Sequence, residues 1–318
     1  MSTPALQAGK RLRIRLPICK DCQRRALASF SPARRSEPQQ AKRTTHFGYA
    51  DVAEDLKASR VGAVFSSVAS SYDTMNDLMS LGIHRLWKDH FVRGLNPGIS
   101  PLSTSAAAQT QQTILDIAGG TGDIAARMLD HATNINRDHE TKVIVSDINA
   151  EMLSEGKKRF ASSDYVHQGR MSFLEANAEE LHMIPSASVD LYTVAFGIRN
   201  FTDKTKALRE AFRVLKPGGV FACLEFTPQL GNPFLNGLYK RWSFGAIPLI
   251  GQVVAGDRDS YQYLVESIER FPDQQTFADM INGVGFLVPG QGGDAEGGWE
   301  DLSLGIAAVH KGIKPLQA

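Results

Sequence analysis

Short apolar runs alternate with amphipathic segments over residues 113–226, and this pattern predicts alternating strands and helices. The apolar runs predict strands at Thr113–Ile117, Lys142–Ser146, Met171–Glu175, Val189–Ala195 and Val220–Phe226. The segments between them predict helices at Asp123–Ala132, Ala150–Phe160, Ala178–Leu181 and Asp203–Leu215. The last helix is expected to stop at Lys216–Gly219, where Pro and Gly interrupt it. Such regular alternation predicts a parallel sheet with helices on both faces.

Further elements are expected on either side of this region. Two helices are predicted before it, at Ala50–Val68 and near Asn76–Leu95, and a polar, low-complexity linker follows at Asn96–Gln112. After it, residues 227–282 have helical character and many aromatic side chains, and Ser303–Val309 is expected to form a final strand. The pattern therefore predicts one α/β domain with helical additions.

Charge is unevenly distributed along the 318 residues, although the formal net charge is only +1. Residues 1–45 hold eleven Lys and Arg against two acids, so the remainder carries 24 basic and 32 acidic side chains. A basic, acid-poor segment with Ser, Ala and Gln and no long apolar core is typical of a mitochondrial transit peptide. A disordered basic tail that touches nucleic acid or anionic lipid is the alternative. We expect a transit peptide at 1–45 and the functional domain at 46–318.

The acidic remainder argues against nucleic acid as the substrate, because phosphate contacts need clustered Lys and Arg. No apolar run approaches the roughly 20 residues that span a bilayer. Cys19 and Cys22 form a CxxC motif without a second pair of metal ligands, so no metal is expected there. Cys223 falls in a predicted buried strand. Three cysteines placed in this way give no disulfide framework and suit a reducing compartment.

The stretch Leu115–Asp123 predicts a strand that runs directly into a tight glycine turn. Gly120 and Gly122 lack Cβ atoms, so the backbone there can approach a bound cofactor closely. The next predicted strand is followed by Asp147, whose carboxylate is well placed to accept hydrogen bonds from a ribose diol. The combination predicts a nucleotide-type cofactor at the carboxyl edge of the parallel sheet.

Two cofactors fit this pattern. Gly120–Ala125 with Asp147 downstream matches the dinucleotide fingerprint, which makes NAD the alternative. Asp116 favours a different cofactor, because an acid at the end of the first strand suits the cationic α-amino group of S-adenosyl-L-methionine and would lie poorly beside a pyrophosphate. The other interpretation of Asp116 is a helix cap or a solvated turn acid. We expect S-adenosyl-L-methionine.

Two longer segments carry a more specific resemblance. Tyr72–Trp87, with the sequence YDTMNDLMSLGIHRLW, resembles the first signature of the ubiquinone/menaquinone-biosynthesis C-methyltransferases. Arg213–Thr227 resembles the second signature of the same family. The similarity extends from about Arg60 to Lys314 and includes Phe196–Asn200 and Asp257–Leu264.

This resemblance implies an α/β fold of the Rossmann-like class I methyltransferases: a mostly parallel seven-stranded sheet, helices on both faces and an added helical lid at residues 228–282. It implies S-adenosyl-L-methionine as the methyl donor and a prenylated benzoquinol of ubiquinone biosynthesis as the acceptor, with a demethylmenaquinol as the alternative acceptor. It also implies cofactor contacts at Thr121, Asp147, Asn177 and Ala178.

Methylation of an aromatic carbon requires an electron-rich ring, which ionisation of a quinol hydroxyl provides. The enzyme must hold that carbon in line with the donor methyl group and exclude water. We expect Arg199 and Asn200 to lie over the methyl group, to orient the quinol oxygens and to stabilise the developing negative charge. Tyr72 is expected to face the substrate. His84 has the intrinsic pKa of a proton relay, and a packing role in a helix is its alternative.

Residues 233–255 carry more apolar and aromatic side chains than a turn needs. One hypothesis is a lid that accepts the polyprenyl tail on a membrane surface, and the other is helix packing or a homodimer interface. Together with the basic leader, the resemblance implies a peripheral protein on the matrix side of the mitochondrial inner membrane. Other ubiquinone-biosynthesis proteins in a membrane-associated complex are the expected partners. A nicotinamide dehydrogenase and a non-catalytic scaffold of such a complex are the alternative functions.

Overall fold

The structure is a computed structural model, and it describes residues 44–68, 77, 80, 82–99, 111–228, 233–241, 245, 252, 258–290 and 298–317. Several expectations fall outside these residues: nearly all of the leader at 1–45, Tyr72, the middle of the linker and the central part of 233–255.

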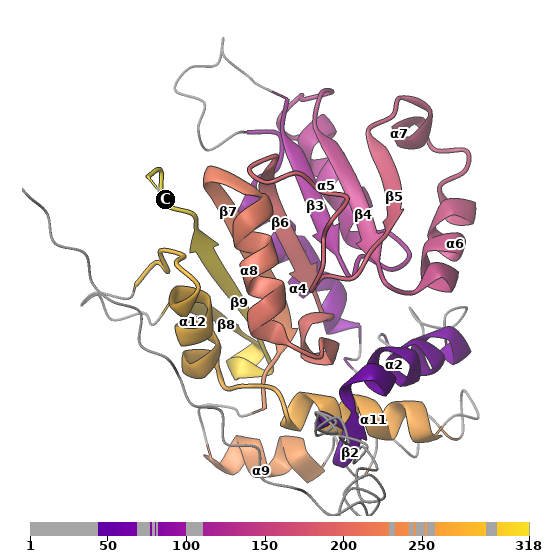
Figure 1. Cartoon of the computed structure of the whole chain (residues 1–318), viewed down its shortest axis with the longest axis vertical. Coiled ribbons are helices and arrows are strands. Elements are labelled where there is room, and N and C mark those ends of the chain that lie inside the picture. Colours follow the sequence, from indigo (N-terminus) through magenta and orange to yellow (C-terminus); the bar gives the residue numbers. More distant parts are fainter. Residues whose placement is uncertain are drawn as a thin grey trace, which may run out of the picture. The chain divides into compact units, whose positions relative to one another are not determined.

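The strands of the alternating region join into a seven-stranded sheet with the order β5-β4-β3-β6-β7-β9-β8 (Figure 1). The strands are β3 (Thr113–Ile117), β4 (Lys142–Asp147), β5 (Met171–Glu175), β6 (Val189–Ala195), β7 (Leu215–Phe226), β8 (Trp299–Leu302) and β9 (Ala307–Ile313). The pairs among β3 to β7 are parallel, whereas β9 is antiparallel to both of its neighbours. The mostly parallel seven-stranded sheet is therefore confirmed.

The strand order reverses at β3, because β4 and β5 lie on one side of it and β6 and β7 on the other. In an open α/β sheet such a switch point leaves a crevice at the carboxyl ends of the strands. The three central strands end close to one another, since Ile117 pairs with Ser146 on one side and with Val194 on the other. Side chains that follow these strands are thus brought together at one edge of the sheet.

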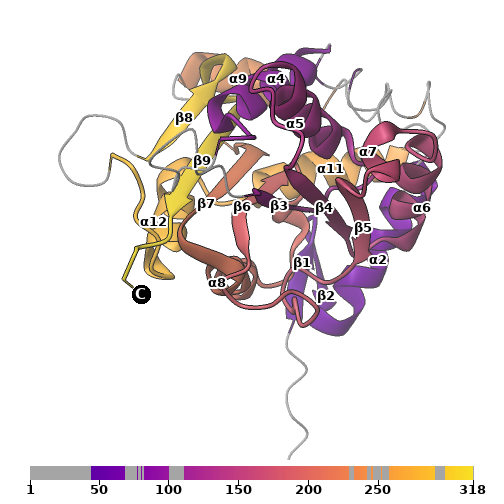
Figure 2. The same ribbon diagram turned by 90° about the horizontal axis from the view of Figure 1, so that it is seen from above.

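Helices cover both faces of the sheet (Figure 2). One face carries α4 (Ile83–Leu95), α5 (Asp123–Asn134) and α6 (Ala150–Arg159), and the other carries α8 (Lys204–Val214) and α12 (Gln274–Gly283). A short helix, α7 (Asp164–His167), precedes β5 and has no counterpart among the predicted elements. The two-sided cover agrees with the predicted alternation.

Alternate residues of β7 show how one strand serves both apolar layers. Ala222 and Leu224 belong to the buried cluster that includes α4 and α5, whereas Phe221 and Cys223 belong to the cluster that includes α8 and α12. A central strand buried on both faces is hydrophobic throughout, which is why the run was recognisable from the sequence. Cys223 is a fully buried free thiol in this second layer.

The chain before α4 differs from its prediction. A hairpin of β1 (Thr44–Phe47) and β2 (Ala50–Ala53) leads into α2 (Glu54–Val68), so the helix predicted from Ala50 is wrong over its first four residues. The hairpin is turned by Gly48, which has a φ of 56°. Glycine takes this left-handed conformation without the Cβ clash that other residues meet.

Two predicted boundaries in the sheet region are also wrong. Lys216–Gly219 does not form a separate break but belongs to β7, at an irregularity where the register with β6 shifts between Val189 and Leu191. The predicted final strand Ser303–Val309 is interrupted by a 3₁₀ turn at Ser303–Gly305, and the strand β9 starts only at Ala307. In both places glycines allow a local bend that the hydrophobic pattern does not reveal.

The predicted short helix Ala178–Leu181 is a turn. Asn177 closes it, because its Oδ1 atom accepts the N–H of Glu179 and its carbonyl accepts the N–H of Glu180. The N–H of Leu181 is donated to the carboxylate of Glu210 on α8 instead of to a helical carbonyl. These contacts satisfy the backbone without a helix.

The described residues of 228–282 fall into separate helices with different surroundings. They include α9 (Pro233–Arg241), α11 (Arg258–Glu269) and α12. Helix α12 buries Phe277, Ala278 and Ile281 against the sheet and therefore belongs to the core. Helix α11 lies with α2 beyond the carboxyl ends of the parallel strands (Figure 1).

Candidate active site

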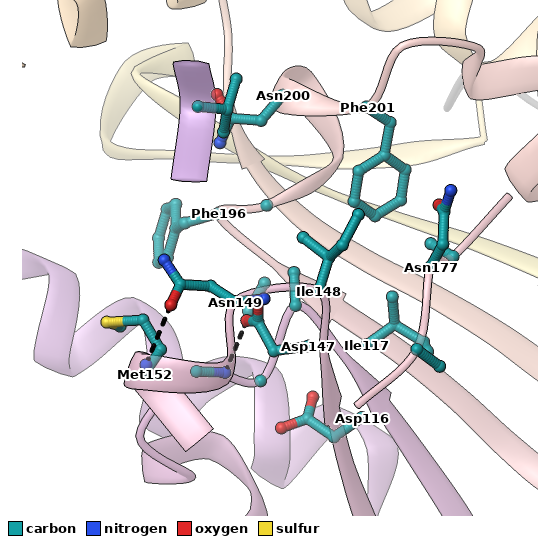
Figure 3. A pocket seen from close by; sticks show the side chains of 18 of the residues that line it. Asp116, Ile117, Asp147, Ile148, Asn149, Met152, Asn177, Phe196, Asn200 and Phe201 are labelled. Atoms are coloured by element: carbon teal, nitrogen blue, oxygen red, sulfur yellow. Dashed lines mark hydrogen bonds between the residues drawn. The ribbon is translucent and has the colours of Figure 1, made fainter. Parts of the chain in front are cut away.

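A cavity of about 450 Å³ lies at the carboxyl ends of the parallel strands (Figure 3). The ends of β3, β4 and β5 bring Asp116, Asp147 and Asn177 to its wall, and the 3₁₀ turn η3 (Ile198–Asn200) adds Asn200. Helix α2 contributes three more lining residues, Glu54, Val61 and Gly62. The structure thus assembles the following predicted cofactor residues in one cavity: Asp116, Gly120, Thr121, Asp147, Asn177 and Ala178.

The glycine turn between β3 and α5 has left-handed backbone at Ala118, Gly120 and Gly122, with φ values of 52, 53 and 84°. A Cβ atom on Gly122 would lie 3.2 Å from the ring of Phe160, which leaves little room for any other residue. Gly120 and Thr121 line the cavity. Gly122 is not among the lining residues and instead turns the chain into α5.

The turn after β6 lies directly against the glycine turn. Phe196 takes a φ of 56°, and an ideal Cβ on Gly197 would lie only 2.4 Å from the Cβ of Ala118. Non-glycine residues in left-handed backbone are uncommon and store strain. Ala118 and Phe196 both line the cavity, so the strained positions of the two turns meet at the site.

Replacing Gly197 with alanine should push these two turns apart. Overpacking of this kind costs about 1–3 kcal/mol of stability. Because the two turns form neighbouring walls of the cavity, we expect weaker cofactor binding by calorimetry as well as a lower Tm. Gly283→Ala on α12 is the matched control, since nothing lies within 4 Å of the Cβ it would gain. Unchanged cofactor affinity in Gly197→Ala would contradict the role given to this contact.

Asp147 fixes the glycine turn to the end of β4. Its Oδ2 atom accepts the N–H of Gly120 at 3.0 Å and its Oδ1 atom accepts the N–H of Asn149 at 2.9 Å. Burial raises the pKa of Asp147, and these backbone donors act in the opposite direction. Each carboxylate oxygen has further acceptor capacity, so Asp147 can also receive the hydroxyl groups of a ribose.

Asp116 is buried and only partly satisfied. Its Oδ1 atom accepts the hydroxyl of Thr193 at 2.8 Å, whereas its Oδ2 atom has no hydrogen-bond partner among the described residues. Burial raises the pKa of Asp116 to about 7, against the effect of the Thr193 hydrogen bond. A buried acceptor without a partner is costly unless a ligand completes it. A cationic group of a ligand could complete Oδ2. An Asp that caps a helix or faces solvent would not be buried with an unpartnered oxygen, so these two alternatives do not describe Asp116.

Asn177 and Ala178 follow β5 on another wall of the cavity. The Oδ1 atom of Asn177 accepts the N–H of Glu179 at 2.9 Å, so its amide NH₂ is the group that could donate to a ligand. The carboxylate of Glu179 accepts the N–H groups of Thr202 and Asp203 at 2.8 and 3.0 Å. Glu179 thereby ties this turn to the segment that follows η3.

Asn200 lies in the cavity with the aromatic rings of Phe196 and Phe201 near it (Figure 3). The carbonyl of Phe201 accepts the ammonium of Lys57 on α2 at 3.0 Å, and the carbonyl of Gly62 accepts the amide of Asn149 at 3.2 Å. These two hydrogen bonds fasten α2 across the cavity. Burial lowers the pKa of Lys57 to about 8.

Arg199 is not among the lining residues, which corrects the expectation that its guanidinium faces the donor methyl group. Its side chain is 2% exposed and its Nη1 atom lies 2.8 Å from Oε1 of Glu225, which is 1% exposed. The guanidinium also donates to the carbonyl of Phe196 and to the hydroxyl of Ser267 on α11. The carboxylate of Glu225 neutralises the charge of Arg199 inside the protein. Through these contacts Arg199 joins the turn after β6 to β7 and to α11.

His84 does not line the cavity either. Its Nδ1 atom lies 2.8 Å from the hydroxyl of Ser80, and the side chain is buried on α4. Burial, followed by the positive charge of Lys88, lowers the pKa of His84 to about 4, which moves it away from the neutral range that favours a proton relay. These contacts support the packing alternative. Tyr72 lies outside the described residues.

Sequence reasoning missed several lining residues. Lys88 on α4 donates to Oδ2 of Asp123 at 2.9 Å, and both side chains line the cavity. Asn149 caps α6 by accepting the N–H groups of Glu151 and Met152. Asn149 could have been found, because an Asn immediately before a helical segment is a typical N-cap. No sequence pattern indicated that Lys88 contacts the helix that follows the glycine turn.

The residues of the cavity fit S-adenosyl-L-methionine. The buried Oδ2 atom of Asp116 suits a cation, Asp147 suits a diol, and the glycine turn leaves room for a ligand close to the backbone. Among the described residues, no group of three or more His, Cys, Asp or Glu side chains is arranged to hold a metal ion.

Residues 53–314 match the model of the ubiE/COQ5 methyltransferase family. The chain belongs to this family. It is similar to the protein named 2-methoxy-6-polyprenyl-1,4-benzoquinol methylase, mitochondrial, of Schizosaccharomyces pombe, with 57% identity over 85% of this chain and 84% of the relative. It is also similar to the ubiquinone/menaquinone biosynthesis C-methyltransferase UbiE of Cereibacter sphaeroides strain ATCC 17029, with 47% identity over 85% of this chain and 97% of the relative.

A crystal structure of a candidate O-methyltransferase from Nostoc punctiforme resembles this fold with a TM-score of 0.50 and 13% identity. The alignment covers 79% of this chain and 60% of that chain, and it concerns the fold alone.

Membership of the ubiE/COQ5 family confirms the predicted family, the methyltransferase activity and S-adenosyl-L-methionine as the methyl donor. The nicotinamide and scaffold alternatives are not supported.

Proposed function

We propose that the protein methylates a ring carbon of a polyprenylated methoxy-benzoquinol in ubiquinone biosynthesis. The observation that carries the proposal is the cavity at the strand ends, which is lined by Asp116 and Asn200. The Oδ2 atom of Asp116 is buried and has no hydrogen-bond partner among the described residues. The names of the similar relatives support this acceptor. A demethylmenaquinol is the second candidate, because the bacterial relatives are named for ubiquinone and menaquinone biosynthesis together.

We assign the donor-binding roles to the strand ends. Asp116 would receive the α-ammonium group at Oδ2, Asp147 the ribose hydroxyls, and Asn177 with Ala178 the adenine ring. Thr121 and Gly120 would contact the donor through the backbone of the glycine turn. When bound, S-adenosyl-L-methionine supplies an electrophilic methyl group on a sulfonium centre.

The acceptor ring would enter between Asn200 and the donor site. Loss of the proton from one quinol hydroxyl makes the ring carbon nucleophilic, and the amide NH₂ of Asn200 would donate to the resulting phenolate oxygen. Donors aimed at developing charge in a site shielded from water are effective because they need no reorganisation. Phe196 and Phe201 would shield this region, since both rings line the cavity. Methyl transfer would leave S-adenosyl-L-homocysteine as the second product. The proton of the methylated ring carbon would then pass through water to the quinol oxygen that had lost its own, so that the ring becomes aromatic again and one proton is released overall.

We further propose that the protein acts in mitochondria, as a peripheral protein on the matrix side of the inner membrane. The basic composition of residues 1–45 and the names of the fungal, plant and animal relatives support the mitochondrial assignment. Other proteins of ubiquinone biosynthesis and a second copy of the chain are the proposed partners. In the part of the chain that the structure describes, no helix is both long and apolar enough to cross a bilayer.

Purified protein should methylate a short-chain methoxy-benzoquinol under reducing conditions, as measured by mass spectrometry of the product. Asn200→Ala should reduce kcat by roughly 100-fold, in the range found for loss of one donor to a developing negative charge. Its affinity for S-adenosyl-L-methionine should stay within about twofold. A demethylmenaquinol analogue run in parallel tests the second acceptor. No methylated product from either acceptor, with donor binding intact, would overturn the proposal.

A further inference from the structure

Asn200 is held by a tyrosine from a distant part of the chain. The hydroxyl of Tyr263 on α11 lies 2.9 Å from Oδ1 of Asn200, across 63 positions of sequence. Tyr263 does not line the cavity, whereas Asn200 does. Tyr263 therefore contacts Asn200 from outside the cavity.

Tyr263 is itself fixed on two sides. Its side chain is buried, and its ring stacks on the ring of Phe47 in β1, with centroids 4.4 Å apart and an interplanar angle of 20°. Burial raises the pKa of Tyr263, so the hydroxyl keeps its proton and can donate. The N-terminal hairpin thus supports α11 at the residue that contacts Asn200.

This contact holds the amide of Asn200 in one arrangement, with Oδ1 against the tyrosine hydroxyl. A carboxamide has an acceptor oxygen and a donor NH₂ group, and the two are exchanged by a half-turn about the last side-chain bond. A tyrosine hydroxyl that donates to Oδ1 stabilises the arrangement in which Nδ2 is directed elsewhere. Figure 3 shows the nitrogen of Asn200 on the side of Phe196 and its oxygen on the opposite side.

We propose that Tyr263 is a positioning residue, which holds Oδ1 of Asn200 so that the NH₂ group is presented to the acceptor ring. The inference rests on the proposed function of Asn200 and adds the residue that holds its amide in place. With the amide reversed, its oxygen would lie against a phenolate oxygen, and two acceptors would repel each other. The hairpin β1–β2 would contribute to this arrangement, because the ring of Phe47 packs on Tyr263 and limits its movement.

Tyr263→Phe removes the hydroxyl and retains the ring that stacks on Phe47. We expect kcat to fall by about 5- to 13-fold, the effect of losing one hydrogen bond of roughly 1–1.5 kcal/mol that keeps the amide oriented. The KM for the donor should be unchanged. Tyr192→Phe is the matched control, because the hydroxyl of Tyr192 is buried in β6 and has no hydrogen-bond partner among the described residues. The control should retain wild-type kcat.

A double-mutant cycle with Asn200→Ala separates positioning from packing. If Tyr263 acts through Asn200, Tyr263→Phe should cause no further loss of kcat in the Asn200→Ala background. An equal loss in both backgrounds, or a wild-type kcat in Tyr263→Phe, would overturn the inference. Failure of the proposed function gives a different result, because Asn200→Ala alone would then keep its activity. Thermal unfolding of each variant shows whether a loss of kcat accompanies a loss of stability.

Discussion

Arg199→Ala is expected to destabilise the protein by about 3–5 kcal/mol and to abolish turnover, because it leaves Glu225 as a buried charge without its partner. The pair is almost fully buried, with side chains 2% and 1% exposed. The guanidinium also holds the carbonyl of Phe196, a residue in left-handed backbone. Its loss should release the turn that carries Asn200. Chemical denaturation and a methyl-transfer assay measure the two effects.

A compensated variant distinguishes this structural role from direct chemistry. Replacing Arg199 and Glu225 together by methionine removes both charges at similar volume, and such exchanges are often neutral for stability. We expect the double variant to recover most of the unfolding free energy that Arg199→Ala loses. If instead Arg199→Ala unfolds like the wild type and is inactive, the guanidinium acts on the substrate directly.

The centre of the sheet was predictable from the sequence because β3 and β6 are buried along almost their whole length. Thr113–Ile117 and Val189–Ala195 have the predicted bounds, since an apolar run ends where the chain leaves the core. The edge strand Met171–Glu175 also has the predicted bounds, although only Met171 is buried in it. The hairpin β1–β2 was not predictable in this way. Its strands have four residues each, and they pair with each other outside the main sheet.

The strand-end part of the site was likewise predictable, and the part built by long-range packing was not. Asp116 lies near the end of one predicted strand and Asp147 follows the next, and parallel strands place their carboxyl ends at one edge. Lys57 and Tyr263 reach the site from α2 and α11, at sequence separations of 144 and 63 from the residues they contact. Arg199 was placed in the correct turn, but its sequence position did not reveal the buried partner Glu225.

Asp116→Asn should weaken the binding of S-adenosyl-L-methionine about 10- to 100-fold, because it removes a charged hydrogen bond worth roughly 1.5–3 kcal/mol. The affinity of the wild type should itself depend on pH. Below the pKa of about 7 for Asp116, the carboxyl is protonated and loses its attraction for an ammonium group. Above about pH 8 the α-amino group of the ligand loses its own proton. Calorimetry should therefore find the tightest binding between these values, and Asp116→Asn should lose the acid-side dependence.

Asp116→Asn should weaken donor binding but raise the stability of the ligand-free protein. The pKa of Asp116 is raised from 3.8 to about 7, so between these values the folded state keeps a proton that the unfolded state has released. Unfolding free energy must then fall as pH rises through this window, by at most roughly 4 kcal/mol. A carboxamide at this position is neutral at every pH, so the Asp116→Asn variant should be the more stable protein at pH 8 although it binds the donor less well. If the wild type is as stable as the variant at pH 8, Asp116 is not the strained acceptor that the donor completes.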